Sequence, residues 1–156
     1  MHIRTYKPDD LPRLQEITLA AFEGVSIDEN IEKRFGKLGQ STWRQRKAEH
    51  ISDDVKANPK GVFVAEEAAQ IVGYLTTRIN TQTRVGWIPN LAVDKPHRRK
   101  GVARALFHKA FEYFKQNGML YSRIETLEQN AVGLTFYPSL GYEEVARQVH
   151  YFMRLP

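Results

Sequence analysis

Residues 86–106 constrain the fold more than any other part of this chain. They read GWIPNLAVDKPHRRKGVARAL: an apolar strand-like run ends at Val93, and after a short turn a basic loop leads directly into a helical pattern. The first N–H groups of a helix lack partners within the helix, and the helix dipole adds partial positive charge there. The small residues Gly101 and Ala103 would let a bulky anion reach the backbone of this loop. The segment therefore predicts a strand, an anion-binding loop and a helix N-terminus in direct succession.

Length and composition indicate one globular domain over residues 1–156, long enough to bury a core. No apolar run approaches a membrane span, and the first residues lack the apolar segment of a signal peptide, so we expect a cytoplasmic protein with no membrane partner. Cysteine is absent, which excludes disulfides, thiolate metal sites and a cysteine nucleophile. No two of the five histidines have ligand spacing, so we expect no metal.

The hydrophobic pattern predicts an α/β chain with a mixed sheet and helices on both faces, because strands occur both next to one another and separated by helices. We expect helices over residues 8–22, 41–58, 102–115 and 130–140, with residues 24–40 only weakly patterned. We expect strands over residues 2–6, 61–67, 70–79, 84–93 and 121–127, and a final hairpin of residues 142–147 and 149–155. The last of these strands could pair with a second copy in a homodimer, since edge strands invite such pairing.

The basic loop has more than one interpretation when it is considered alone. Six of the ten residues from Lys95 to Arg104 are basic or histidine, which fits a pyrophosphate site, a solvated basic turn or a nucleic-acid patch. Neither the G-x-x-x-x-G-K-[ST] motif nor the three-glycine dinucleotide motif is present. The net charge of +5 is too small to require nucleic acid, and the sequence lacks RNA-binding aromatic motifs and zinc spacing. We therefore expect no nucleic-acid partner.

A second informative segment is residues 130–142, NAVGLTFYPSLGY. A helix that begins at Asn130 places Asn130 and Tyr137 on one face, so both side chains can point toward the same groove. Considered separately, Asn130 fits a helix cap and Tyr137 fits an ordinary half-buried aromatic side chain.

Together, the two segments resemble the GCN5-related N-acetyltransferase (GNAT) family. The first matches [RQ]-x-x-G-x-[GA] over residues 98–103, and the second matches N-x-x-[AG]-x-x-F-Y-x-x-x-G-[FY] over residues 130–142, in the family's order and at its usual separation. The resemblance extends over nearly the whole chain. It implies the GNAT acyl-CoA N-acyltransferase fold, whose mixed sheet is splayed at the cofactor strand. It also implies acetyl-CoA as the donor of an acetyl group to a primary amine, by direct attack in a ternary complex.

The resemblance also implies how acetyl-CoA would be held. Loop N–H groups would bind the pyrophosphate, and the pantetheine arm would lie along the end of the preceding strand like an added strand. Pro89 fits the bulge that splays this strand, because proline cannot donate to a sheet ladder; alternatively, Pro89 simply weakens the strand. The implied cofactor-binding residues are Leu91, Ala92, Val93, Arg98, Arg99, Lys100, Gly101, Val102, Ala103, Arg104, Asn130 and Tyr137.

Three catalytic roles follow from the same resemblance. Tyr137 would protonate the leaving thiolate, and the backbone N–H near Leu91 would stabilise negative charge on the carbonyl oxygen. Glu125 would be the base, as in the branch that acetylates protein N-termini; otherwise it forms a salt bridge with a nearby arginine and water is the base. Asn90 lies where other branches keep a carboxylate, but an amide cannot take the proton.

The acceptor is the least constrained part of this interpretation. Acidic and aromatic side chains around residues 22–45 and 145–152 could hold a cationic amine. The combination of Glu125, Asn130 and Tyr137 favours a peptide or protein amine. Two rival functions remain, a non-catalytic acyl-CoA-binding regulator of the same fold and a basic nucleic-acid-binding module.

Overall fold

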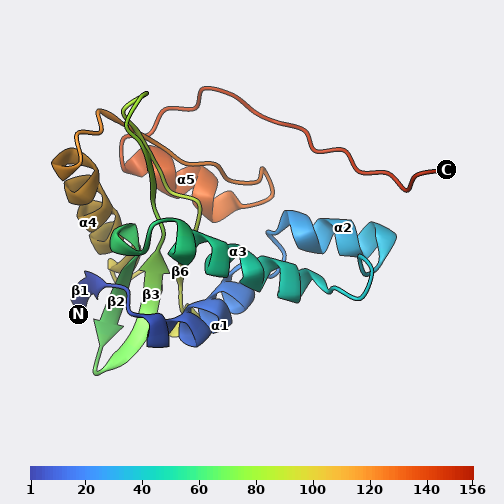
Figure 1. The fold of residues 1–156 in the computed structure, drawn as a ribbon, viewed down its shortest axis with the longest axis horizontal. Helices are drawn as coiled ribbons and strands as arrows, with labels where there is room; N and C mark the ends of the chain where they lie inside the picture. The colour runs from blue at the N-terminus through green and yellow to red at the C-terminus, as the bar shows by residue number, and fades with distance from the viewer.

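The computed structural model describes residues 1–156 and contains two sheets divided at an interrupted central strand. Figure 1 labels the strands of the first sheet. The first sheet has the order β1-β2-β3-β6 and the second has the order β4-β5-β7. All pairings are antiparallel except that of β5 with β7, so the predicted mixed sheet is confirmed. The strands are β1 (His2–Thr5), β2 (Phe63–Glu67), β3 (Gln70–Leu75), β4 (Arg78–Asn80), β5 (Val85–Trp87), β6 (Leu91–Val93) and β7 (Tyr121–Arg123). The helices are α1 (Leu11–Ala21), α2 (Ile27–Phe35), α3 (Trp43–Ala57), α4 (Val102–Gln116) and α5 (Ala131–Ser139).

Helices cover both faces of the first sheet, as predicted. On one face α1 and α3 bury Leu14 and Ile51 against Val64 and Tyr74. On the other face α4 buries a core around Phe107. None of these helices is long and apolar enough to cross a membrane.

The two sheets separate because two predicted strands are each broken in the middle. Residues 84–93 form β5 and β6 with a break over residues 88–90, and residues 70–79 form β3 and β4 with a break at Thr76 and Thr77. Pro89 lacks an N–H group, and the N–H of Asn90 donates to Thr76 Oγ1 at 3.1 Å instead of to a strand backbone. The splay predicted at Pro89 is therefore present.

The helix boundaries follow local sequence signals. Thr42 caps α3, with its Oγ1 accepting from the N–H of Gln45 at 3.2 Å, and Pro8–Asp10 form one 3-10 turn before α1. The weakly patterned residues 24–40 contain α2. The predicted strand 121–127 is shorter than expected, since pairing ends at Arg123.

The predicted C-terminal hairpin is wrong. Residues 143–156 form neither helix nor strand, and every one of them is exposed. The segment leaves α5 as an extended tail whose end lies far from the sheets (Figure 1). The alternating pattern of a strand is present there, but residues 142–155 contain no Gly, Pro, Asn or Asp to form the turn of a hairpin.

Candidate functional site

The strand predicted to hold the cofactor has one unpaired edge. β6 pairs only with β3. At one end of β6 the carbonyl of Asn90 accepts from the N–H of Thr76 at 2.9 Å, and at the other end the N–H of Asp94 donates to the carbonyl of Val72 at 2.8 Å. Because the direction of these bonds alternates along a strand, Leu91 and Val93 turn their main-chain groups toward the free edge. The carbonyl of Val93 there accepts a hydrogen bond from Arg98 Nε at 3.1 Å. β6 therefore offers main-chain hydrogen-bonding groups to an extended ligand.

The loop after β6 presents a run of free amides. Arg99 and Gly101 adopt positive φ angles of 61° and 82°, and the first main-chain bond of α4 runs from Ala105 N to Gly101 O at 3.0 Å. None of the six backbone N–H groups from Arg99 to Arg104 donates to another protein atom. Backbone N–H groups gathered by such turns, at the positive end of a helix dipole, form a concave site for an anion.

The charges around this loop favour the same ligand class. Arg98, Arg99 and Lys100 are exposed and form no ion pair, while Arg104 reaches Ser139 on α5 at 3.4 Å. The Nε2 atom of His97 lies 3.5 Å from the carboxylate of Glu67. The side chains of Ala92 and Val102 are buried beneath the loop and anchor it to the core. The predicted loop residues therefore combine free amides with exposed positive charge between β6 and α4.

Tyr137 lies on α5 with its ring in an aromatic cluster. The ring centre is 6.1 Å from that of Phe107 and 6.3 Å from that of Tyr142. Burial, with a smaller contribution from Tyr142, raises the pKa of Tyr137 to about 12. Its hydroxyl makes no hydrogen bond to another protein atom. The phenol is therefore protonated at neutral pH and has a free donor.

Asn130 has the geometry of a helix cap. Its Oδ1 accepts from the N–H of Gly133 at 3.2 Å, and its Nδ2 donates to Thr126 Oγ1 at 2.8 Å. A Cβ atom at Gly133 would lie 2.9 Å from Asn130 Nδ2 and 3.1 Å from the ring of Tyr137. Both side chains therefore lie beside Gly133, on one face of α5, as the spacing predicted.

Glu125 is exposed and held by two neighbours. Trp87 Nε1 donates to its carboxylate at 2.7 Å, and Arg123 forms an ion pair with it. The salt bridge that the sequence allowed is therefore present. Because Trp87 ends β5, the carboxylate lies beside the strand that leads into the break at residues 88–90.

A buried polar network at this break was missed by sequence reasoning. Lys47 Nζ donates to Asn90 Oδ1 at 2.9 Å and lies 3.9 Å from the ring centre of Phe22. Asn90 Nδ2 donates to Asp54 at 2.7 Å, and Arg78 forms a 2.8 Å ion pair with the same carboxylate. The network ties α3 to the residue that precedes Leu91.

The protonation of this network is set mainly by burial. Desolvation lowers the pKa of Lys47, while Asp28 and Asp54 act in the opposite direction. One available signal was the spacing of Lys47, Ile51 and Asp54, which places both charged residues on the apolar face of α3.

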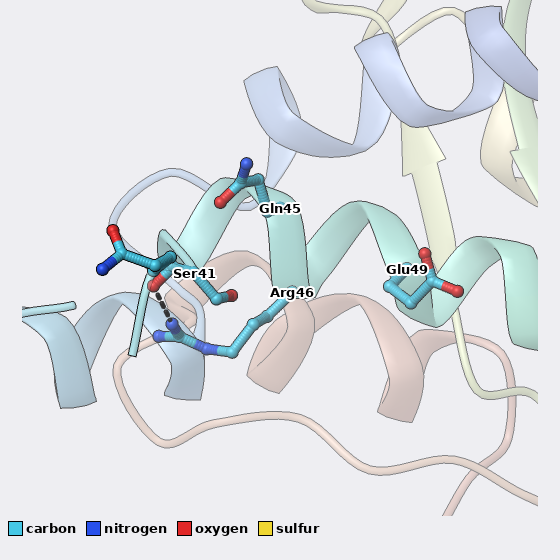
Figure 2. Close-up of a pocket in the computed structure, with 5 residues that line it drawn as sticks. Ser41, Gln45, Arg46 and Glu49 are labelled. Atoms are coloured by element: carbon cyan, nitrogen blue, oxygen red, sulfur yellow. Dashed lines mark hydrogen bonds between the residues drawn. The ribbon is translucent and has the colours of Figure 1, made fainter. Parts of the chain in front are cut away.

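A separate hollow lies at the start of α3. It has a volume of about 500 Å³ and is entirely polar (Figure 2). Its lining residues are Gln40, Ser41, Gln45, Arg46 and Glu49. Arg46 bends back to the carbonyl of Ser41 at 2.8 Å, as Figure 2 shows. None of the predicted site residues lines it, so we place the candidate site at β6 and the N-terminus of α4.

Comparison with known proteins finds distant relatives that are named as acetyltransferases. The chain is 27% identical over 147 residues to an uncharacterized N-acetyltransferase from Methanocaldococcus jannaschii, which covers 91% of this chain and 60% of that protein. It is 29% identical over 97 residues to the N-alpha-acetyltransferase MAK3 from Arabidopsis thaliana, covering 61% of this chain and 51% of that one. The chain thus spans about half to three fifths of the length of these relatives.

A solved structure and a family model agree with these relatives. The PaiA N-acetyltransferase from Thermoplasma acidophilum, in complex with coenzyme A, superposes with a TM-score of 0.72 at 20% identity, covering 91% of this chain and 89% of that chain. The model of the acetyltransferase (GNAT) family matches residues 16–142, which include both motifs. The resemblance found in the sequence is thereby confirmed, and the chain belongs to the GNAT acetyltransferase family.

Proposed function

We propose that this chain is an acetyl-CoA-dependent N-acetyltransferase that acts on a primary amine. The observation that carries the proposal is the run of unpartnered N–H groups from Arg99 to Arg104 beside the free edge of β6. Family membership and the coenzyme A complex of the PaiA protein support the same ligand.

The residues present fit acetyl-CoA along one continuous path. The N–H groups from Arg99 to Arg104 bind the pyrophosphate, with Arg98 and Lys100 adding positive charge. Leu91 and Val93 hydrogen-bond the pantetheine arm through the unpaired edge of β6. We propose that this path ends at the strand break of residues 88–90, with the thioester near Tyr137.

Acetyl-CoA supplies a thioester whose carbonyl carbon an amine can attack. The N–H of Leu91 stabilises negative charge that develops on the carbonyl oxygen, and the network of Lys47, Asn90 and Asp54 fixes the strand at that point. The hydroxyl of Tyr137 donates to the departing sulfur. Glu125 accepts the proton of the amine, directly or through water.

A peptide or protein amine is the acceptor that we favour. The N-alpha-acetyltransferase MAK3 from Arabidopsis thaliana is among the relatives, and another N-alpha-acetyltransferase, from Sulfurisphaera tokodaii, is 26% identical over 114 residues. An exposed carboxylate such as that of Glu125, next to the indole of Trp87, suits the cationic end of an extended chain.

The test is thiol release from acetyl-CoA in the presence of an amine library. The library should contain peptides with free N-termini, N-blocked lysine peptides, polyamines and aminoglycosides. We expect turnover with at least one peptide amine and none when all amines are omitted. Binding of coenzyme A without transfer to any amine would contradict an enzyme and favour an acyl-CoA-binding regulator, and absence of binding would overturn the whole proposal.

A further inference from the structure

Lys47 carries a buried amino group with no carboxylate beside it. The residue is 9% exposed, and its Nζ donates one hydrogen bond, to Asn90 Oδ1 at 2.9 Å. Lys47 belongs to none of the ion pairs in the structure. A protonated lysine has three N–H donors, so two of them lack an acceptor in the protein. Because buried charges are normally paired, this setting favours an anionic ligand beside Nζ.

The carboxylates that act on Lys47 from a longer range are each paired with an arginine. Arg78 forms a 2.8 Å ion pair with Asp54, and Arg46 forms a 3.2 Å ion pair with Asp28. Desolvation outweighs the effect of these two carboxylates, so the pKa of Lys47 is lowered. The positive charge of the protonated side chain is therefore not balanced by the acidic groups around it.

An aromatic ring is the other group in contact with this amine. The ring centre of Phe22 lies 3.9 Å from Lys47 Nζ, and Phe22 follows the last residue of α1 and is only partly buried. A ring attracts a cation through its π electrons, but a carboxylate adds charge and directed acceptors. Rotation of this partly exposed ring would give a small anion access to Nζ.

The two faces of β6 place Lys47 opposite the proposed acid. Ala92 packs with the core under α1 and α3, and Asn90, two residues earlier, points to the same face and contacts Lys47. Tyr137 packs against Phe107 of α4, which covers the other face. With the proposed acid on the α4 side, the α3 side is open to the acceptor in the proposed reaction.

Lys47 also lies at one end of the strand break that Glu125 contacts at its other end. Lys47 contacts Asn90, the residue before Leu91, whereas Glu125 accepts from Trp87 at the end of β5. The intervening residues correspond to roughly 10 Å of extended chain. An acceptor with its amine between Glu125 and Leu91 would therefore have its neighbouring groups within reach of Lys47.

We propose that Lys47 binds a carboxylate of the acceptor, so that the preferred acceptor carries a carboxylate close to its primary amine. This inference rests on the proposed function and narrows its acceptor class. The carboxylate takes the two free donors of Nζ in place of the ring of Phe22. Two sources have this chemistry: the α-carboxylate of a free amino acid, and an acidic side chain at the first or second residue of a peptide.

The first experiment measures thiol release from acetyl-CoA with acceptors in matched pairs. Two pairs are C-terminally amidated peptides with glutamate or glutamine at the first or at the second residue, and the third pair is glycine and glycinamide. We expect kcat/KM for the carboxylate member to exceed that for the amide member at least 10-fold in one pair, because a buried hydrogen bond between charged groups has effects of this order. The pair that shows the preference identifies the source of the carboxylate.

Variants of α3 test whether Lys47 causes the preference. Lys47→Met removes the charge but keeps a long side chain beside Phe22, and we expect the ratio of the two kcat/KM values to fall to about 1. Lys47→Arg keeps a cation and should retain the preference. Lys56→Met, at an exposed position of the same helix, is the matched control and should also retain it. The ratio is taken within one variant, so a general loss of activity does not change it.

A binding measurement covers the case in which Lys47→Met has no measurable turnover. Calorimetry gives the dissociation constants of the N-acetylated products of the preferred pair for the full chain loaded with coenzyme A. We expect the carboxylate product to bind the parent chain at least 10-fold more tightly than the amide product, and Lys47→Met to bind both equally.

The outcomes separate this inference from the function on which it rests. Equal kcat/KM values within every pair, or a preference that persists in Lys47→Met, would overturn the role of Lys47 and leave the N-acetyltransferase activity intact. Absence of transfer to any amine would overturn the proposed function, and this inference with it.

Discussion

At the scale of single residues, the free hydroxyl of Tyr137 gives the sharpest kinetic prediction. Tyr137→Phe removes the donor but keeps the ring among Phe107 and Tyr142. We expect kcat for thiol release to fall by about 10²-fold, since loss of a proton donor has effects of this order. The dissociation constant for coenzyme A, measured by calorimetry, should remain unchanged. An unaltered kcat from pH 6 to 9 would remove Tyr137 from the chemistry.

Lys47 gives a stability prediction of defined sign. Because burial lowers its pKa below the ordinary 10.5, the folded chain binds fewer protons than the unfolded chain between that lowered pKa and about 10.5. The free energy of unfolding of the parent chain, relative to Lys47→Met, should therefore rise as pH increases through this window. Urea unfolding of both proteins at pH 7 and pH 9.5 measures the difference. A difference that stays constant, or that shrinks, contradicts the assignment of a buried ammonium.

At the scale of elements, the first turn of α4 can be tested amide by amide. Ala103→Pro removes one of the free N–H groups at the second position of the helix, where proline is already present in α1 as Pro12. We expect the dissociation constant for coenzyme A to rise about 10-fold or more, because a hydrogen bond to a charged group contributes roughly 1.5–3 kcal/mol. Ala103→Ser, which keeps the N–H, is the control. Circular dichroism should show equal helix content in both, and equal affinities would exclude this amide from the anion site.

The same elements show what a sequence can and cannot specify. The break at Pro89 was predictable because a missing N–H is a local property. The matching break at Thr76 and Thr77 was not, since threonine favours strands and the break depends on distant partners such as the carbonyl of Gly61, 2.7 Å from Thr77 Oγ1. The predicted C-terminal hairpin was wrong for a related reason, because an alternating pattern predicts a strand but does not identify the strand with which it pairs.

The candidate site also has parts that the sequence could predict and parts that it could not. The loop of residues 98–104 and the pair Asn130 and Tyr137 lie within short motifs, so their spacing along the chain is enough to find them. The contact between Lys47 and Asn90 joins residues 43 positions apart, and it exists only after α3 packs against the first sheet. Local pattern therefore predicted the parts that we propose as the cofactor site, but not the network that holds the strand in place.

At the scale of the whole molecule, buried phenols limit stability in alkali. Burial raises the pKa values of Tyr74, Tyr137 and Tyr142 above the ordinary 10, so above pH 10 the folded chain binds more protons than the unfolded chain. The free energy of unfolding should therefore fall as pH rises beyond 10. Urea midpoints between pH 9 and 11 measure this decline, and Tyr74→Phe should make it shallower. A midpoint that is independent of pH over this range would contradict the burial of these hydroxyls.

The position of Trp87 has an optical consequence. It is one of only two tryptophans in the chain. Its indole N–H donates to the carboxylate of Glu125, and the guanidinium groups of Arg78 and Arg123 lie 5.8 and 5.0 Å from the ring. Replacement of Trp43 by phenylalanine leaves a single emitter at the junction of the two sheets. We expect its fluorescence to change when a ligand alters the charges around it, so the chain would carry its own optical reporter at that junction.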